Sequence, residues 1–436
     1  MWGERPGDPI PGADREAEVA NEKPATLIRP VDALERVFYR YSERNPTHFV
    51  LVAEFDEVLT AHRVRTALAA VQRRHPLLSA HVEDRPGTRL GFYRAAVVAP
   101  IDLTVRRGGE WQAAAAEELS LTFEPARAPL MRASLLQGAA GSALLLVFDH
   151  AIADGISSVL VLRDLLAVLN GETLAELPAR PSQERLIDRT LAAVDPIDLS
   201  DMPEDPRMGT PSVIRAFDGA LTNVHTVAVA ETDTARLAQR CRAERTTVHA
   251  ALVVAMCRVR AAERGEEFVR VLNPINSRAL VGVDADFGLY IQATWTGLEP
   301  GDGQPFWNQA RAITAHLDVA RSARGIRTAS LAIGQAMPVN GENSHAEELF
   351  GRIRPWEMLV TNLGVQNLGG TGPLRPTAIW APVVQSQTEG EYVTGITTYE
   401  GRLRMVTCGY SVPSTFLKSV VETLVAPVEG PKRDAP

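Results

Sequence analysis

Residues 143–158 contain the pattern that most restricts the fold, because an apolar run leads through a short polar segment into a helical stretch. They read Ala-Leu-Leu-Leu-Val-Phe-Asp-His-Ala-Ile-Ala-Asp-Gly-Ile-Ser-Ser. Five successive apolar residues, from Ala143 to Val147, predict a strand buried on both faces. Gly155 is expected to supply the conformational freedom for the turn from this strand into a helix. His150 then lies at the mouth of a strand, where the backbone is held more rigidly than at a loop tip.

Three interpretations of His150 are compatible with the sequence. It is a general base, because the ordinary pKa of imidazole lies near neutrality. Alternatively it forms a surface pair with Asp154, or it is a core histidine whose nitrogens are hydrogen-bonded. A metal site built from Asp149, His150 and Asp154 is not expected, since the chain has no HExxH segment and no His-rich partner segment.

The order of strand and helix patterns predicts two comparable α/β halves, and a length of 436 residues exceeds that of most single domains. In the first half we expect strands at 48–55, 78–83, 90–98, 130–137 and 142–149, and helices at 31–40, 60–74, 110–120 and 156–169. In the second half we expect strands at 223–230, 267–273, 289–297, 356–361, 376–387, 391–398 and 402–410, and helices at 232–243, 247–264, 304–323 and 413–424.

Composition marks the boundaries between these parts. Residues 1–27 carry Pro, Gly and mixed charges and are predicted to be a disordered N-terminal segment. Residues 177–215 are rich in Pro, Asp and Arg and form the predicted linker, with a short helix near 184–194. The N-terminal half accordingly covers 28–176, and the C-terminal half covers 216–436.

Four segments resemble motifs of the chloramphenicol acetyltransferase-like superfamily, which includes condensation domains, polyketide-associated acyltransferases and plant BAHD acyltransferases. Residues 149–155 resemble the HHxxxDG signature, and residues 74–78 (Arg-His-Pro-Leu-Leu) resemble the RHPxLR stretch. Residues 123–132 resemble the FDLxxGPLxR stretch, and residues 246–252 resemble the helix that opens the second half. The likeness extends from about residue 28 to about residue 425, and only the combination of segments is specific.

The resemblance implies a fold class and roles for particular residues. It implies two α/β sandwich halves that form a V with a tunnel between them, and His150 as the catalytic base at the middle of that tunnel. It implies that Asp154 is structural and forms a salt bridge with an arginine of the second half, for which Arg278 is the candidate. The first histidine of the signature is replaced by Asp149, so the role of that position in the family does not carry over.

Further residues have a structural and a functional interpretation. The backbone N–H of Gly155 faces a developing oxyanion, or the residue only forms the turn. Asn362, in a segment that resembles the tunnel wall opposite the histidine, contacts substrate or forms a turn. Ser158, like its neighbour Ser157, contacts the intermediate or caps the helix. Two groups are expected outside the site: His249 as a core histidine, and Arg236, Arg240, Arg242 and Arg245 as a solvated face or a phosphate contact.

Charge and composition exclude several classes of protein. A net charge of −8 argues against a general nucleic-acid binder, which needs a basic face. The sequence shows no signal peptide and no apolar run of membrane-spanning length, so a cytoplasmic protein is expected. Its three cysteines form no CxxC pair and no disulfide framework is expected. One chain supplies both halves, so a monomer is sufficient.

These observations lead to an acyltransferase hypothesis with an open alternative. The acyl group comes from acyl-coenzyme A, or from the phosphopantetheine thioester of an acyl carrier protein, and no tightly bound cofactor is expected. The acceptor is a small molecule, namely a hydroxyl of a polyketide, lipid or other specialised metabolite. Amide formation is the nearest variant, and a non-catalytic binding scaffold of the same fold is the alternative, because a fold does not fix a function.

Overall fold

The computed structural model describes residues 25–87, 89–198, 205–283, 285–353, 355–370 and 372–425. Most of the N-terminal segment expected to be disordered therefore lies outside the described residues. Its last residues are ordered, because strand β1 begins at Thr26. Within the described ranges, no helix has both the length and the apolar character needed to cross a membrane. The three cysteines are buried and free.

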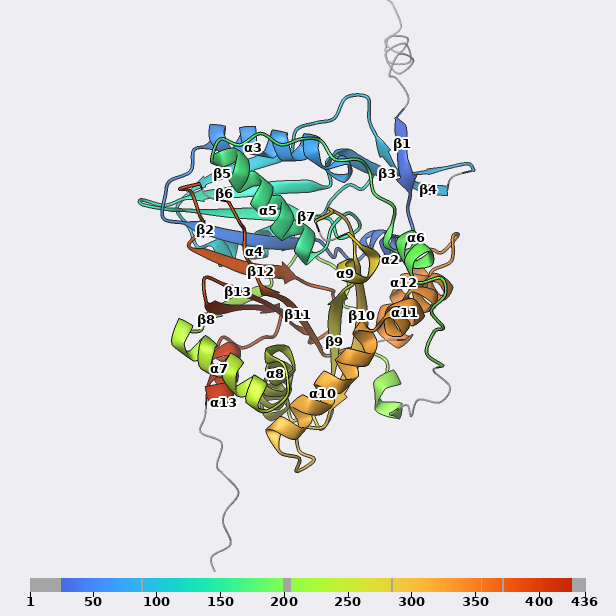
Figure 1. The fold of residues 1–436 in the computed structure, drawn as a ribbon, viewed down its shortest axis with the longest axis vertical. Helices are drawn as coiled ribbons and strands as arrows, with labels where there is room; N and C mark the ends of the chain where they lie inside the picture. Colours follow the sequence, from blue (N-terminus) through green and yellow to red (C-terminus); the bar gives the residue numbers. More distant parts are fainter. Residues whose placement is uncertain are drawn as a thin grey trace, which may run out of the picture.

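The N-terminal half is built around a five-stranded sheet with the order β12-β2-β7-β6-β5. Its strand β7 is central and almost wholly buried, as its apolar run predicted, and it pairs with β6 in antiparallel register. Helices α3 and α5 lie side by side over one face (Figure 1). The elements are β2 (Phe49–Phe55), α3 (Ala61–Arg74), β5 (Asp102–Arg107), α4 (Trp111–Leu119), β6 (Met131–Gln137), β7 (Ser142–Phe148) and α5 (Gly155–Leu169).

A small sheet and a short helix flank this half. The sheet has the order β1-β4-β3, and helix α2 carries the chain from it into the five-stranded sheet. Helix α6 lies in the predicted linker and packs near the N-terminus of α2, since the backbone N–H of Leu34 donates to Glu184 at 2.7 Å. The elements are β1 (Thr26–Pro30), α2 (Ala33–Ser42), η2 (Pro76–Ser79), β3 (Ala80–Arg85), β4 (Arg89–Arg94), α6 (Gln183–Thr190) and η3 (Pro206–Gly209).

The C-terminal half is a six-stranded mixed sheet with the order β10-β9-β11-β13-β14-β8. Helices α8, α10 and α13 cover the face that points away from the N-terminal half (Figure 1). Helix α8 is apolar around most of its circumference because it is packed between its neighbours and the sheet. The strands are β8 (Asn223–Ala228), β9 (Val269–Asn276), β10 (Ile291–Leu298), β11 (Met358–Val365), β13 (Tyr392–Tyr399) and β14 (Arg402–Gly409). The helices are α7 (Glu231–Ala243), α8 (Val248–Arg264), α9 (Arg278–Val281), α10 (Phe306–Arg321) and α13 (Phe416–Val425).

Several elements were not expected from the sequence. The helix predicted at 304–323 corresponds to α10, but a second helix, α11 (Ala323–Ala336), follows it directly. Helix α10 ends before Ser322, and α11 begins after it. The side chain of Ser322 caps the start of α11 by accepting a hydrogen bond from the backbone N–H of Gly325 at 3.1 Å. Strands β1 and β5, helix α12 (Asn343–Glu348) and the η4 turn (Leu349–Ile353) were also missed.

Strand β12 (Ala378–Val384) crosses from one half to the other. It lies in the C-terminal part of the sequence, yet it pairs with β2 at the edge of the N-terminal sheet. The boundary between the halves drawn along the sequence therefore assigns β12 to the C-terminal half, whereas strand pairing assigns it to the N-terminal sheet. The apolar core is also shared, since Leu272, Leu359 and Val393 of the six-stranded sheet belong to the same buried cluster as the N-terminal core.

Close packing of β12 over β13 predicts a specific sensitivity at Gly395. A Cβ atom at this position would lie 2.5 Å from the carbonyl oxygen of Pro382, closer than real contacts allow. We expect Gly395→Ala to destabilise the protein by about 1–3 kcal/mol through overpacking. Gly334→Ala, on an open face of α11, is the matched control and should leave the thermal unfolding midpoint unchanged or slightly higher. Equal midpoints for the two variants would contradict this packing.

Candidate active site

The polar segment between β7 and α5 is a tight connection closed at both ends by aspartate side chains. The carboxylate of Asp149 accepts a hydrogen bond from the backbone N–H of Ala151 at 2.9 Å. Asp154 caps α5, and its Oδ1 accepts from the backbone N–H of Ser157 at 2.8 Å. His150 is held between these two turns, so the sequence prediction that it follows the central strand is correct.

The imidazole of His150 is packed between aromatic rings. The ring of Phe38, on α2, stacks on it with the centroids 4.0 Å apart and an interplanar angle of 11°. Phe49, on β2, makes an edge contact at 5.0 Å and 61°. The His150 side chain remains partly exposed, but its Nδ1 is buried and has no hydrogen bond of good geometry among the described residues. Nε2 is not engaged by any side chain of the described chain, so this nitrogen is open to a substrate.

Burial controls the charge of this imidazole. It lowers the pKa of His150 to about 4, although the charge of Asp154 and the carbonyl groups of His150 and Ala153 act in the opposite direction. The ring is therefore neutral near pH 7 and can accept a proton. Burial also raises the pKa of the neighbouring Asp149 to about 6, against the hydrogen bond from Ala151.

Asp154 forms the ion pair with Arg278 that the resemblance implied. The guanidinium binds both carboxylate oxygens, at 2.8 and 2.9 Å, and both side chains are almost completely buried. Burial would raise the pKa of Asp154, but Arg278 and the backbone N–H groups of Ser157 and Tyr290 outweigh it and lower the pKa. Both oxygens are thus occupied, so Asp154 does not act on His150 as the acid of a triad.

The serines at the start of α5 bind the protein itself. Ser157 Oγ donates to the carbonyl oxygen of Gly288 at 2.6 Å and accepts from Arg278 at 2.8 Å, so it extends the ion pair toward β10. Ser158 Oγ donates to the carbonyl oxygen of Gly155 at 2.7 Å. This geometry favours the structural interpretation of both serines over contact with an intermediate.

Gly155 is required for a reason that differs from the one expected. It is the first residue of α5 and does not have a left-handed backbone conformation, so the prediction that it supplies turn freedom is wrong. A Cβ atom there would lie 2.7 Å from the side chain of Leu363 and 3.1 Å from that of Pro382. The glycine instead allows β11 and β12 to approach the start of α5.

Asn362 is placed on the other side of its strand from Leu363. Asn362 pairs with Ile396 of β13, and paired residues of neighbouring strands point to the same face of a sheet. Ile396 belongs to the core beneath the helices of the C-terminal half. Its Oδ1 accepts from the backbone N–H of Gly364 at 2.8 Å. Both observations favour the turn-forming interpretation over contact with substrate or oxyanion.

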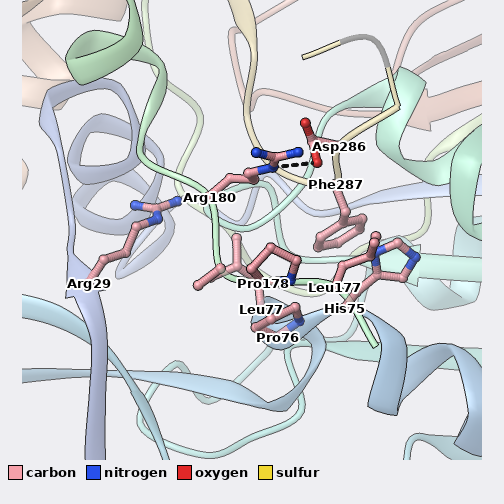
Figure 2. A pocket seen from close by; sticks show the side chains of 10 residues that line it. Arg29, His75, Pro76, Leu77, Leu177, Pro178, Arg180, Asp286 and Phe287 are labelled. Atoms are coloured by element: carbon pink, nitrogen blue, oxygen red, sulfur yellow. Dashed lines mark hydrogen bonds and ion pairs between the residues drawn. The ribbon is translucent and has the colours of Figure 1, made fainter. Parts of the chain in front are cut away.

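A narrow pocket with a volume of only about 20 Å³ lies where the linker meets both halves (Figure 2). The phenyl ring of Phe287 and the imidazole of His75 form one side of it, with their centroids 5.3 Å apart. Arg180 lies across the pocket and forms an ion pair with Asp286 at 2.8 Å (Figure 2). The segment 286–288 thus helps to anchor the linker through Asp286 and the start of α5 through the carbonyl oxygen of Gly288.

The remaining candidates lie away from this site. His249 is buried in α8, and its Nε2 is hydrogen-bonded to Asn273 Oδ1 at 3.0 Å, which confirms a core histidine. The arginines of α7 are on the outer side of the six-stranded sheet (Figure 1), where Arg236 and Arg240 form ion pairs within the helix region. This position favours a solvated face. In the part of the chain that is described, no three His, Cys, Asp or Glu side chains are grouped to hold a metal ion.

The aromatic neighbours of His150 were missed by sequence reasoning. Phe38 lies more than 100 positions earlier in the chain, and the segment that contains it was predicted only as a short helix at 31–40. The one available signal was an aromatic residue in a helix near the start of the resemblance. Nothing local connects that residue to His150, because the contact depends on how α2 packs.

Removal of the Asp154 carboxylate should leave Arg278 buried and unpaired. We expect Asp154→Ala to lower the free energy of unfolding by about 3–5 kcal/mol. Because the pKa of Asp154 is lowered, the contribution is fully present above the ordinary aspartate pKa of about 4, and it is lost only as the pH falls through the lower folded-state value. The loss should therefore be the same at pH 6 and pH 8 in denaturant titrations.

Glu57→Ala is the matched control for this measurement. Glu57 pairs with Arg63 at 2.7 Å, but both side chains are largely exposed, so little change is expected. A loss for Asp154→Ala as small as that of the control would show that the buried pair does not join the two halves.

Part of the N-terminal half matches a known protein family by sequence, and most of the chain matches solved structures by fold. Residues 36–185 match the model of the condensation-domain family, and this range contains Phe38, His150 and Asp154. No curated protein matches the chain by sequence.

Three solved structures illustrate the likeness in fold. Polyketide synthase associated protein 5 from Mycobacterium tuberculosis has a TM-score of 0.65 at 17% identity, over 92% of this chain and 98% of that one. The SgcC5 protein from Streptomyces globisporus has a TM-score of 0.61 at 16% identity, over 91% and 97%. The condensation domain that mediates chain release from the enacyloxin polyketide synthase has a TM-score of 0.55 at 20% identity, over 94% of this chain and 87% of that one.

The family match supports a transferase of the acyl-transfer or condensation type. Residues 36–185 thus match the condensation-domain family, and the chain as a whole has the fold of the condensation domains and related proteins, in agreement with the resemblance inferred from the sequence.

Proposed function

We propose that the protein is an acyltransferase that moves an acyl group from a thioester to a hydroxyl of a small molecule, with His150 as the general base. The observation that carries the proposal is a neutral imidazole that is partly exposed and has an unengaged Nε2. A general base must be unprotonated at the working pH and must have its lone pair open to the acceptor. His150 meets both conditions near pH 7.

The chemical step needs no covalent enzyme intermediate. His150 Nε2 takes the proton from the acceptor hydroxyl as its oxygen forms a bond to the thioester carbonyl carbon. The tetrahedral intermediate then collapses, the carbon–sulfur bond breaks, and the proton on His150 passes to the departing thiolate. Such a base typically contributes about 10² to 10⁴ in rate.

The surroundings of His150 suit this chemistry because they limit access of water. The side chain is covered by Phe38 and Phe49, and Leu363 of the C-terminal half approaches the start of α5 nearby. A thioester that reacts with an alcohol must be kept from bulk water, or hydrolysis competes. We place the two substrates in a tunnel between the halves, where they meet at His150.

The substrates are proposed by class. The donor is acyl-coenzyme A or an acyl carrier protein thioester, and the acceptor is a hydroxyl of a polyketide, lipid or other specialised metabolite. The similarity in fold to polyketide synthase associated protein 5 supports this choice. An amine acceptor, which would give an amide, can use the same base, so acceptors of both kinds belong in one panel with product analysis by mass spectrometry.

Replacement of His150 tests the proposal directly. We expect His150→Ala to lower kcat/KM by about 10²- to 10⁴-fold, because the acceptor loses its base while the fold is kept. Thermal unfolding and binding of the acyl thioester should be retained. His62→Ala, at an exposed position on α3, is the matched control and should have normal activity. Turnover at the normal rate by the His150→Ala variant would reject this residue as the base.

The pH dependence of the reaction provides a second test. Since burial lowers the pKa of His150 to about 4, the ring stays unprotonated well below the ordinary histidine range. Activity should therefore be lost only as the pH falls through about 4 to 5 and should stay level between pH 5.5 and 7. A profile of kcat/KM with an acid limb near 6.5 would contradict a base in this environment.

A further inference from the structure

The His150 ring has an unusual form of support for a proposed base. Its Nδ1 is buried without a hydrogen bond of good geometry among the described residues. Catalytic histidines are commonly oriented by a carboxylate or a carbonyl on the nitrogen that does not react. Here the nearby carboxylate of Asp154 is occupied by Arg278, Ser157 and Tyr290. The carbonyl groups of His150 and Ala153 also act on the ring, but without a hydrogen bond of good geometry, so a further contact that restricts the imidazole is expected.

The phenyl ring of Phe38 supplies such a contact. At a centroid distance of 4.0 Å and an angle of 11°, it lies nearly parallel to the imidazole and covers one face. Phe49 meets the ring at 61° and restricts it from a second direction. The lone pair of Nε2 lies in the plane of the imidazole, so a ring stacked on the face leaves the direction of proton transfer open.

Helix α2 holds Phe38 in place, because two side chains of this helix are hydrogen-bonded to the C-terminal half. The guanidinium of Arg36 donates to the carbonyl oxygen of Met337 at 3.0 Å. The hydroxyl of Tyr41 donates to the carbonyl oxygen of Ser386 at 2.7 Å. Phe38 lies between these two anchors on a rigid element, and it is partly exposed, like His150. Neither ring of the stacked pair is therefore fully buried.

We propose that Phe38 is a positioning residue that fixes the imidazole plane of His150 by aromatic stacking, so that Nε2 points toward the acceptor. Phe38 acts through His150 and touches no reacting atom, and the inference rests on the proposed function of His150. The stacked ring also keeps water from one face of the imidazole. A positioning error of about 1 Å can cost an enzyme on the order of 100-fold in rate.

The test compares three variants on the same helix. Phe38→Leu removes the aromatic face and keeps apolar bulk, whereas Phe38→Tyr keeps the ring. Val37→Ala is the matched control, since Val37 is fully buried but belongs to the cluster around Tyr41 and Met337. Histidine-labelled protein is titrated by NMR, with the His150 signal assigned by its loss in His150→Ala, and kcat and KM are measured over pH for each variant.

We expect Phe38→Leu to lower kcat by about 10- to 100-fold with a smaller change in KM. Its His150 signal should titrate above pH 5, because water reaches the ring, while the wild-type signal should not titrate there. Asp154 and the adjacent Asp149, whose pKa is raised to about 6, are the titratable groups near His150, and both are unchanged in all three variants, so a difference between variants does not arise from either carboxyl group. Phe38→Tyr should behave as the wild type. Val37→Ala should lose thermal stability and leave both the titration and kcat unchanged.

Several outcomes would overturn the positioning role. One is a His150 titration in Phe38→Leu that equals the wild type, and another is a shift of the same size in Val37→Ala. A shifted titration with normal kcat would also overturn it. The NMR titration does not depend on turnover, so these results are distinguishable from failure of the proposed function, which is judged by the activity of His150→Ala.

Discussion

The buried ion pair between Asp154 and Arg278 is the contact on which the geometry of the site depends. It joins the start of α5, directly after His150, to the C-terminal half. Two charges taken out of water lose their solvation, and hydrogen bonds from the surrounding polar groups offset part of that loss. Asp154 receives two bonds from the guanidinium and two from backbone N–H groups, whereas Nε of Arg278 has no hydrogen-bond partner among the described residues. The turn that carries His150 is therefore fixed at its C-terminal end by a contact with the C-terminal half.

This use of Asp154 has a consequence for the imidazole. A carboxylate that is bound to an arginine on both oxygens is not available to orient a histidine, which leaves the backbone carbonyl groups of His150 and Ala153 and the packing of aromatic rings. The aromatic contacts of Phe38 and Phe49 restrict the ring and exclude water, and the same burial keeps the imidazole neutral. Orientation and charge state of the proposed base thus have a common physical origin.

The two halves are joined by a strand and by a common hydrophobic core. Strand β12 completes the N-terminal sheet, and residues of the six-stranded sheet enter the N-terminal hydrophobic cluster. Helix α2 is in turn anchored to the C-terminal half through Arg36 and Tyr41. Any rearrangement between the halves would move Phe38, Arg278 and Leu363 together, and all three lie close to the segment around His150.

Elements that depend on a local residue pattern could be predicted from the sequence alone. The strand expected at 142–149 is β7 (Ser142–Phe148), and the helix expected at 156–169 is α5, because an apolar run and a helical period are properties of neighbouring residues. The family resemblance added Arg278, since the motif of Asp154 implies a partner. Tertiary structure alone decided that Phe38 stacks on His150, that β12 crosses between the halves and that Gly155 makes room for Leu363. These are contacts between residues more than 100 positions apart, and no period or spacing along the chain records which surfaces meet when its halves pack.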